Sequence, residues 1–223
     1  MPERSTTAIV GVGHIGSALA RHLSHGGESL VLAANDRANV EALAVELGPD
    51  VRAASVEDAI ADADAIVFAL WLDDMKEVVP QQARLLEGKV VIDPSNPISF
   101  DSGKPTRTLP EGQSAGSIVA SLLPASAHYV KAFGTLAADT LAVAALREPR
   151  RAALFYATDD AVAATSIERL IRSAGFDPVK AGGLDAAVRI ETPGGDLHQF
   201  GLNGEIIDLE QANAALAADS TPR

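Results

Sequence analysis

The sequence predicts an α/β protein built on a doubly wound, mostly parallel β-sheet, with a small α/β appendage at its C-terminal end. Short runs rich in Val, Ile and Leu alternate with helical patterns through the first half of the chain, which is typical of consecutive βαβ units. The run 64–70 is apolar after its first residue, as expected of a parallel strand buried on both faces. A glycine-rich turn joins the first such run to the first helix.

Each element is expected from its own local pattern. Strands are predicted at 7–12, 29–34, 51–53, 64–70, 89–93, 128–133, 151–159 and 176–183. Helices are predicted at 14–27, 38–48, 55–63, 73–88, 115–123, 136–146, 161–175 and 207–218. Glycines end the first two helices, and Ser55 has the position of an N-cap three residues before Asp58. Pro80 predicts a kink in the fourth helix.

Composition limits the classes of partner. The 223-residue chain has a formal net charge of −12, so we expect no general affinity for nucleic acid or anionic membranes. It contains no cysteine, which excludes disulfides, thiolate metal sites and a cysteine nucleophile. Residues 1–6 lack the features of a signal peptide, and no apolar run reaches the roughly 18 residues that a membrane helix needs. We therefore expect a soluble cytoplasmic protein.

The turn after the first strand carries the clearest functional motif. Gly11, Gly13 and Gly16 satisfy the pattern G-x-G-x-x-G between a strand and a helix, the context of a Rossmann dinucleotide-binding turn. The first glycine permits the tight turn, the second lets the backbone approach a pyrophosphate, and the third lets the helix pack closely on the strand. N–H groups at the helix start then face the phosphates. His14 is expected to line the pyrophosphate or face solvent rather than take part in catalysis.

Residues at the end of the second strand bear on the choice between NAD and NADP. Asp36 lies about 20 residues after Gly16, where an acid usually binds the ribose 2′-hydroxyl of NAD. Arg37, together with Asn35, can instead hold the 2′-phosphate of NADP. The residues alone leave both cofactors open.

The segment 94–114 is unusually rich in Pro, Gly and small polar residues for the interior of a compact domain. Long loops of this kind are often functional, and this one follows a strand at the edge where open α/β sheets bind ligands. No paired carboxylates or histidine spacing indicates a metal, and Asp73 and Asp74 are expected to open a helix. We therefore predict neither a metal site nor an acid–base catalytic residue.

Six segments together resemble the F-420-dependent NADP oxidoreductase family. They are GVGHIGSALA, VLAANDR, ADAIVFALWLDDMKEVV, VVIDPSNPIS, HYVKAFGTLAADTL and AGGLDAAVRIE, in the family's order between Ala8 and Glu191. The family pairs a Rossmann domain with a small C-terminal part. The resemblance therefore implies an NAD(P)-binding domain over residues 1–125 and a smaller substrate and dimerisation part over residues 126–223.

The resemblance also implies hydride transfer between NADP(H), with NAD possible, and the deazaflavin coenzyme F-420, in a homodimer. Asn35 and Arg37 would hold the 2′-phosphate. The rest of the nucleotide would contact Gly11, Val12, Gly13, His14, Ile15, Gly16, Leu70, Trp71, Asn96 and Pro97. The deazaflavin ring would stack on a floor that includes Phe133, Gly134 and Thr135. Catalysis would then depend on proximity, orientation and exclusion of water.

Two features differ from the family. Its well-studied F-420-using members carry a histidine at the position of Gly134, and a helix that continues in the family is interrupted here after Glu191 by TPGGD, which cannot sustain one. Both lie on the presumed second-substrate side. Two other hypotheses therefore remain: an NAD(P)H-dependent reductase of a flavin, ferric chelate or small carbonyl compound, and a non-catalytic dinucleotide-binding sensor. Trp71 is equally compatible with a core or a lid position, and Thr135 with substrate binding or a helix cap.

Overall fold

The computed structural model describes residues 5–101, 103 and 105–218. Residues 1–4, on which part of the signal-peptide prediction rests, and residues 102, 104 and 219–223 lie outside the described residues. The sheet strands are β1 (Thr6–Val10), β2 (Ser29–Ala33), β3 (Val51–Ala53), β4 (Ala65–Phe68), β5 (Val90–Asp93), β8 (His128–Lys131), β9 (Ala153–Ala157) and β10 (Asp177–Gly182). The α-helices are α1 (His14–His25), α2 (Arg37–Leu47), α3 (Val56–Asp62), α4 (Leu72–Gln81), α5 (Ala115–Leu122), α6 (Ala138–Val143), α7 (Ala161–Ser173), α8 (Ala187–Ile190) and α9 (Leu209–Ala218).

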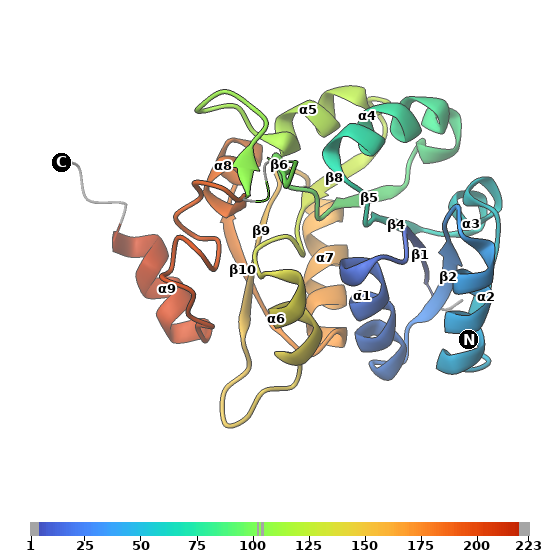
Figure 1. The fold of residues 1–223 in the computed structure, drawn as a ribbon, viewed down its shortest axis with the longest axis horizontal. Coiled ribbons are helices and arrows are strands. Elements are labelled where there is room, and N and C mark those ends of the chain that lie inside the picture. The colour runs from blue at the N-terminus through green and yellow to red at the C-terminus, as the bar shows by residue number, and fades with distance from the viewer. Residues whose placement is uncertain (1–4, 102, 104, 219–223) are drawn as a thin grey trace.

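Eight strands form one sheet in the order β10-β9-β8-β5-β4-β1-β2-β3, and helices flank it on both faces (Figure 1). The six strands from β3 to β8 in this order are parallel. β9 joins β8 in antiparallel orientation through the pair Lys131–Ala157, and β10 is parallel to β9. The predicted fold class, a doubly wound and mostly parallel sheet, is confirmed.

Alternating residues of the central strand β1 belong to different cores. Ile9 packs with Leu19 and Leu23 of α1 in one cluster, whereas Ala8 and Val10 belong to a cluster on the opposite face. All five side chains are almost completely buried. A strand covered on both faces favours consecutive apolar residues, which explains why the run Ala8–Val10 is apolar throughout rather than alternating.

Two predicted helices are shorter than expected by five residues or more. The predicted helix 73–88 ends at Gln81, and a 3₁₀ turn, η1 (Ala83–Leu86), follows it. Pro80 therefore lies in the last turn of α4. The predicted helix 136–146 is reduced to α6, because the chain leaves helical geometry before Leu146, where φ is +56°. The Ser55 cap is confirmed, since Ser55 Oγ accepts from Asp58 N at 3.0 Å.

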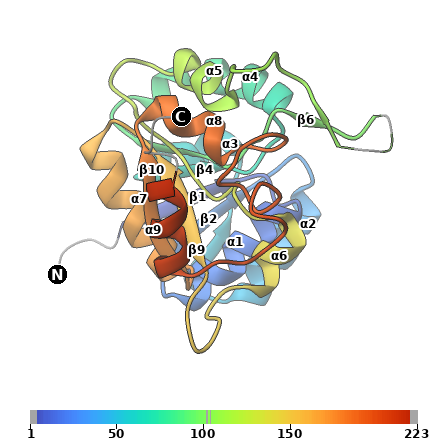
Figure 2. The ribbon, with the colours of Figure 1, turned by 90° about the vertical axis from the view of Figure 1, so that its left-hand side faces the viewer.

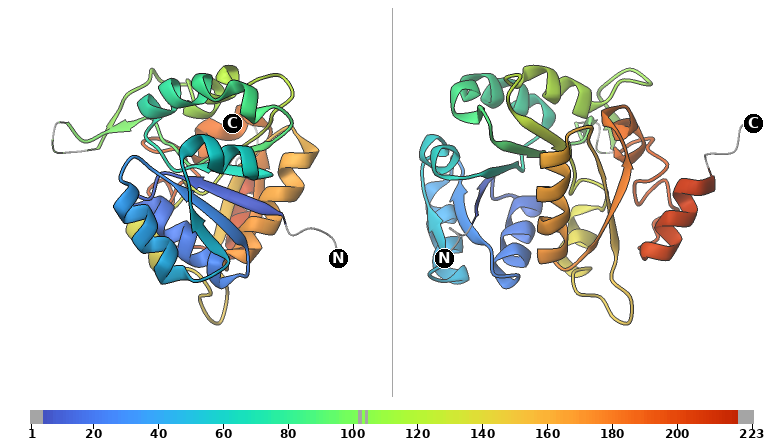
Figure 3. Two further views of the ribbon diagram at one scale, coloured as in Figure 1. Left: turned by 90° about the vertical axis from the view of Figure 1, so that its right-hand side faces the viewer. Right: turned by 180° about the vertical axis from the view of Figure 1, so that it is seen from behind.

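The segment 94–114 contains a short antiparallel hairpin, β6 (Ile98–Ser99) and β7 (Thr106–Arg107). These strands extend away from the body of the molecule beside α4 and α5 (Figures 2 and 3). The base of the hairpin is held by the bond from Thr108 N to Pro97 O, at 2.9 Å. Within the described residues, none of the helices is both long and apolar enough to span a membrane.

Candidate active site

The turn between β1 and α1 requires glycine at two positions and leaves the third open. Gly11 has φ +95°, and a Cβ there would lie 2.5 Å from Ala69 O. A Cβ on Gly16 would lie 1.9 Å from Gly11 O, whereas one on Gly13 would meet no atom within 4 Å. These are the geometric roles of a dinucleotide-binding turn: a tight turn, a close helix contact and an open face toward the ligand.

The other residues of the turn leave the start of α1 accessible. Gly13 is the N-cap of α1, and no side chain accepts a hydrogen bond in that cap. His14 is exposed, while Val12 and Ile15 are partly buried against the core. The first N–H groups of a helix lack partners inside the helix, so the start of α1 retains donors suited to an anion.

At the end of β2, the acidic residue Asp36 and the basic residue Arg37 have different environments. Asp36 is the N-cap of α2, where Oδ1 accepts from Asn39 N at 3.1 Å and Oδ2 accepts from Asn39 Nδ2 at 2.7 Å. The Arg37 side chain is 82% exposed, and its Nε donates to Glu41 Oε1 at 2.7 Å. Asn35 is also exposed. The carboxylate is therefore engaged in a helix cap, whereas Arg37 and Asn35 face solvent.

The residues after β4 lie against the glycine turn. Leu70 Cδ2 is 2.9 Å from the position of a Cβ on Gly11. The Trp71 side chain is 57% exposed and meets the ring of Phe100 edge to face, with centroids 6.2 Å apart and an interplanar angle of 72°. Trp71 is therefore not a core residue.

Asn96 joins three distant segments through its side-chain amide. Its Nδ2 donates to Gly134 O at 3.0 Å, and its Oδ1 accepts from Thr192 N at 2.8 Å. Pro97, next to it, is buried. The structure thus brings Asn96 together with the predicted floor, and both ends of its amide bind protein backbone.

The predicted floor is buried. Phe133 is fully buried with φ +66°, and Thr135 is 2% exposed. A Cβ on Gly134 would lie 2.5 Å from Pro94 O, so a larger side chain there would displace backbone. Thr135 Oγ1 is buried without a hydrogen-bond partner among the described residues. Thr135 does not cap α6, whose N-cap is Ala137, and the capping hypothesis for this residue is therefore wrong.

Residues 192–204, here called the acceptor loop, cover this floor. Gln199 N donates to Thr135 O at 2.9 Å, and Gln199 Oε1 accepts from Ala137 N at 2.9 Å. Gln199 Nε2 donates to Gly204 O at 3.0 Å. The loop begins where α8 ends, after Glu191, as the TPGGD residues predicted.

A buried ionic cluster lies beneath the acceptor loop. Lys131 Nζ is 3.0 Å from Asp93 Oδ2 and 3.8 Å from Glu191 Oε1, and it also donates to Ser95 O. Tyr129 donates its hydroxyl to Asp93 Oδ2 at 2.7 Å. The three charged side chains are at most 2% exposed. Buried charges require partners of this kind, and the cluster links β5, β8 and the start of the acceptor loop.

Glu191 also binds the start of α5. Its carboxylate accepts from Ala115 N at 3.0 Å and Gly116 N at 2.8 Å, a favourable place for an anion. Burial raises the pKa of Glu191, while Lys131 and the two N–H groups act in the opposite direction. Burial, followed by the charge of Asp93, raises the pKa of Tyr129 well above its usual value, so Tyr129 stays a hydrogen-bond donor.

Comparison with known families matches the part of the chain that contains the glycine turn. The sequence model of the family described as NADP oxidoreductase coenzyme F420-dependent matches residues 6–97. A hypothetical protein from Sinorhizobium meliloti is 33% identical with a TM-score of 0.75, and the match covers 84% of this chain and 90% of that one. The family match places residues 6–97 of this chain in the F-420-dependent NADP oxidoreductase family. A search of curated protein sequences finds no significant match.

More distant structures share the fold. A putative F-420-dependent NADP reductase from Arthrobacter sp. FB24 is 24% identical with a TM-score of 0.69, and the match covers 81% of this chain and 86% of that one. A reductive aminase from Aspergillus terreus, solved with NADPH4, cyclohexanone and allyl amine, is 19% identical with a TM-score of 0.62. That match covers 90% of this chain but 60% of the aminase.

Within this family fold, the ionic cluster is the part of the site that the sequence analysis missed. Asp93, Lys131 and Glu191 are far apart in the chain and meet only in the folded sheet. An acid at the end of the apolar run VVID and a lysine inside HYVKAF were available signals, because buried charges are rare without a partner.

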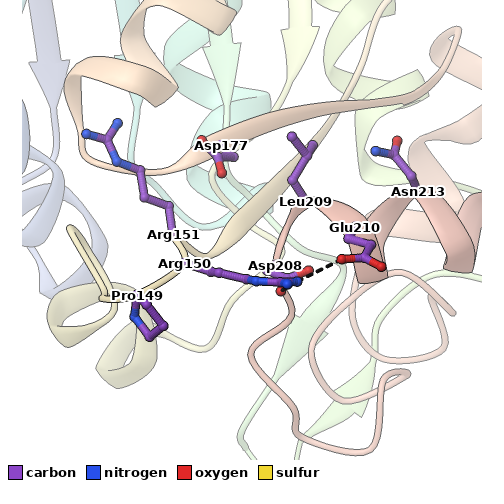
Figure 4. A pocket seen from close by; sticks show the side chains of 8 residues that line it. All are labelled: Pro149, Arg150, Arg151, Asp177, Asp208, Leu209, Glu210 and Asn213. Atoms are coloured by element: carbon purple, nitrogen blue, oxygen red, sulfur yellow. Dashed lines mark hydrogen bonds and ion pairs between the residues drawn. The ribbon is translucent and has the colours of Figure 1, made fainter.

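A hollow elsewhere on the molecule does not belong to this site. Its volume is about 530 Å³, and it is lined by Pro149, Arg150, Arg151, Asp177, Asp208, Leu209, Glu210 and Asn213 (Figure 4). Arg150 is already paired there with Asp208 and Glu210, at 2.9 and 2.8 Å. None of the predicted nucleotide-binding residues lines it. In the described part of the chain, no group of three or more His, Cys, Asp or Glu side chains could hold a metal ion.

Proposed function

We propose that this oxidoreductase binds NADP(H) and exchanges hydride between the nicotinamide and the deazaflavin ring of F-420, as a cytoplasmic homodimer. In this proposal, residues 1–125 bind the nucleotide and residues 126–223 form the smaller substrate and dimerisation part. Family membership supports the reaction class. The choice of acceptor and the assembly follow from the resemblance to that family.

The observation that carries the proposal is the open glycine turn beside a solvent-facing arginine. The open face at Gly13 and the uncapped start of α1 suit a pyrophosphate. Arg37 is exposed and Asp36 already caps α2, which favours a 2′-phosphate over a 2′-hydroxyl ligand. We therefore favour NADP over NAD.

The protein's part in the reaction is positioning. NADP(H) supplies the hydride when bound. Gly11 to Gly16 and Arg37 would hold its phosphates, Leu70 and Trp71 would border it, and Asn96 would maintain the backbone at Gly134 and Thr192 on the nicotinamide side. The buried floor and the acceptor loop exclude water from the junction, which favours hydride transfer over side reactions.

A second candidate is the reduction of a small carbonyl compound. Thr135 carries a buried hydroxyl without a partner among the described residues, and a buried hydroxyl of this kind costs free energy unless a ligand pairs with it. A carbonyl oxygen would accept its proton in a hydrogen bond. The closed floor also suits a small acceptor better than a large ring.

The test is direct. NADPH and NADH are titrated by calorimetry, and NADPH is then mixed with F-420 while the deazaflavin absorption band is followed. We expect NADPH to bind at least tenfold more tightly than NADH and the band to disappear. Reduction of FMN, a ferric chelate or a small ketone, with F-420 unchanged, would support the second candidate. Tight NADPH binding without any reduction would contradict both and favour a sensor.

A further inference from the structure

We propose that Trp71 and Phe100, here called the aromatic rim, form a binding subsite for the flat ring of the hydride acceptor, a deazaflavin or flavin. The inference deepens the proposed function and rests on it. It places the ring contact on the exposed rim instead of the buried floor at Phe133, Gly134 and Thr135.

Exposed aromatic rings are scarce in this protein. Aromatic residues make up 4% of the sequence, and most of those described are buried, including Phe68, Phe133, Phe155, Phe176 and Tyr156. In the described part of the chain, the large apolar side chains with high exposure include three aromatics: Trp71 at 57%, Phe100 at 54% and Phe200 at 60%. Of these, Trp71 and Phe100 touch each other. An exposed apolar cluster of this kind commonly marks a binding surface.

The two rings of the rim come from elements that connect to the nucleotide turn and to the acceptor loop. Trp71 is the N-cap of α4 and directly follows Leu70, whose side chain lies against Gly11. Phe100 follows β6 in the hairpin that begins beside Asn96 and Pro97. The other strand of that hairpin is tied to the acceptor loop, because Arg107 Nη1 donates to Pro193 O at 2.7 Å. Two elements that border the predicted cofactor site therefore each contribute one ring.

The arrangement of the rings leaves flat surface for a ligand. In an edge-to-face pair, the ring that presents its edge keeps its faces free of its partner. More than half of each side chain is in contact with water. Stacking a third ring there removes apolar surface from water and adds an aromatic contact, and both effects stabilise the complex.

The floor offers no comparable surface. Phe133 is fully buried, Thr135 is 2% exposed and a Cβ on Gly134 would meet Pro94 O. The bonds from Gln199 N to Thr135 O and from Ala137 N to Gln199 Oε1 hold the acceptor loop over it. A planar acceptor therefore meets accessible aromatic surface at the rim, and the rim determines whether flat acceptors are selected.

The experiment measures binding without turnover. The protein is saturated with NADP⁺, and oxidised F-420 is titrated by calorimetry; because both partners are oxidised, no hydride moves. FMN is titrated in a second arm to distinguish a deazaflavin from a flavin. Trp71→Ala and Phe100→Ala are each expected to weaken ring binding at least tenfold. Phe100→Ala, at a residue with no assigned nucleotide contact, is expected to change NADP⁺ affinity less than threefold. Trp71→Phe, which keeps a ring, is expected to recover most of the loss.

Two controls separate the rim from general effects. Val162→Ala removes an apolar side chain of similar exposure, 51%, on α7, and should leave ring binding unchanged. Trp71 is the only tryptophan in the sequence, so acrylamide quenching of tryptophan emission reports on it alone. Bound F-420 or FMN should lower the slope of that quenching.

The outcomes are distinguishable. If wild-type protein reduces F-420 and both alanine variants bind F-420 with unchanged affinity, the assignment of the rim as the ring-binding subsite is wrong, while the proposed function holds. If Phe100→Ala weakens NADP⁺ binding as much as it weakens ring binding, the rim belongs to the nucleotide site and the inference is overturned. If the NADP⁺ complex binds neither F-420 nor FMN, both the inference and the favoured function fail.

Discussion

The two sides of the candidate site differ in how accessible they are. On the nucleotide side, Gly13 has open space in front of it and the Arg37 side chain is 82% exposed. On the acceptor side, Phe133 and Thr135 are buried. The Gln199 side chain binds the backbone at Ala137 and at Gly204. The nucleotide side is thus preformed for a ligand, whereas the acceptor side is closed by its own hydrogen bonds. The difference indicates that a ligand at the nucleotide side needs little rearrangement, whereas a ligand at Thr135 requires the hydrogen bonds of Gln199 to open.

The largest expected effect separates two glycines of the nucleotide side. Gly16→Ala would place a Cβ 1.9 Å from Gly11 O, so the backbone must shift, at a cost of more than about 3 kcal/mol and with loss of NADPH binding. Gly13→Ala meets no atom within 4 Å and should keep the melting temperature while weakening NADPH binding. Thermal unfolding and NADPH titration test both variants. Equal melting temperatures for the two would contradict the assigned roles.

The free energy of unfolding should depend on pH through His198, on the acceptor side. Burial lowers the pKa of His198 to about 4 from 6.5, and Nδ1 accepts from Phe200 N at 3.1 Å, so the folded protein holds the neutral ring. The unfolded chain binds a proton below pH 6.5, which favours unfolding as the pH falls. Stability from this group is therefore lost between about pH 6.5 and pH 4, by up to about 3 kcal/mol.

Chemical unfolding of wild type and His198→Asn across this range measures the effect. The asparagine keeps an acceptor for Phe200 N but does not titrate. The stability difference between the two proteins should therefore shrink as the pH falls from 6.5 to 4. A difference that stays constant with pH would show that His198 does not titrate in this range.

The closure of the acceptor side depends on Gln199. Gln199→Ala removes the acceptor for Ala137 N and the donor to Gly204 O, which should destabilise the protein by about 1–2 kcal/mol. Hydrogen exchange should accelerate at Ala137 and within the acceptor loop, while the glycine turn stays protected. Gln81→Ala, an exposed helix position, is the matched control. Acceleration spread evenly over the chain would argue against a local closure.

The smallest expected effects concern the choice of nucleotide. Arg37→Ala should weaken NADPH binding at least tenfold, about 1.4 kcal/mol, through loss of a charge-assisted contact to phosphate, with NADH affinity little changed. Glu41→Gln frees Arg37 from its ion pair and should tighten NADPH binding by less than threefold. An unchanged NADPH affinity in Arg37→Ala would refute the assignment. Asp36→Ala measured with NADH then shows whether the acid holds the ribose.

The nucleotide side was predictable because its contacts are local. The glycine spacing, the Ser55 cap and the strand–helix alternation each lie within one βαβ unit, so sequence patterns report them directly. Gly16 illustrates this: its closest neighbour, Gly11 O, is five residues away. The helix lengths were less accurate, since the ends after Pro80 and before Leu146 depend on packing and turn geometry as well as on pattern.

The acceptor side was not predictable in the same way because its contacts are distant in sequence. Asn96 binds backbone at Gly134 and Thr192, and Glu191 binds the start of α5. No local pattern specifies such pairs. The sequence did indicate that the helix would end before TPGGD. Nothing in it showed that the acceptor loop would cover Phe133 and Thr135.

The pairing of β5 with β8 has a consequence for how substrates reach the site. Four residue pairs, from Val90–His128 to Asp93–Lys131, join the strands on either side of residue 125, and the last of these pairs carries the Asp93–Lys131 ion pair. A hinge rotation of the later part of the chain against the earlier part would break this ladder and separate buried charges. Clamshell closure of two lobes is therefore a costly mechanism for this fold, and gating falls to the loops at the sheet's carboxyl edge.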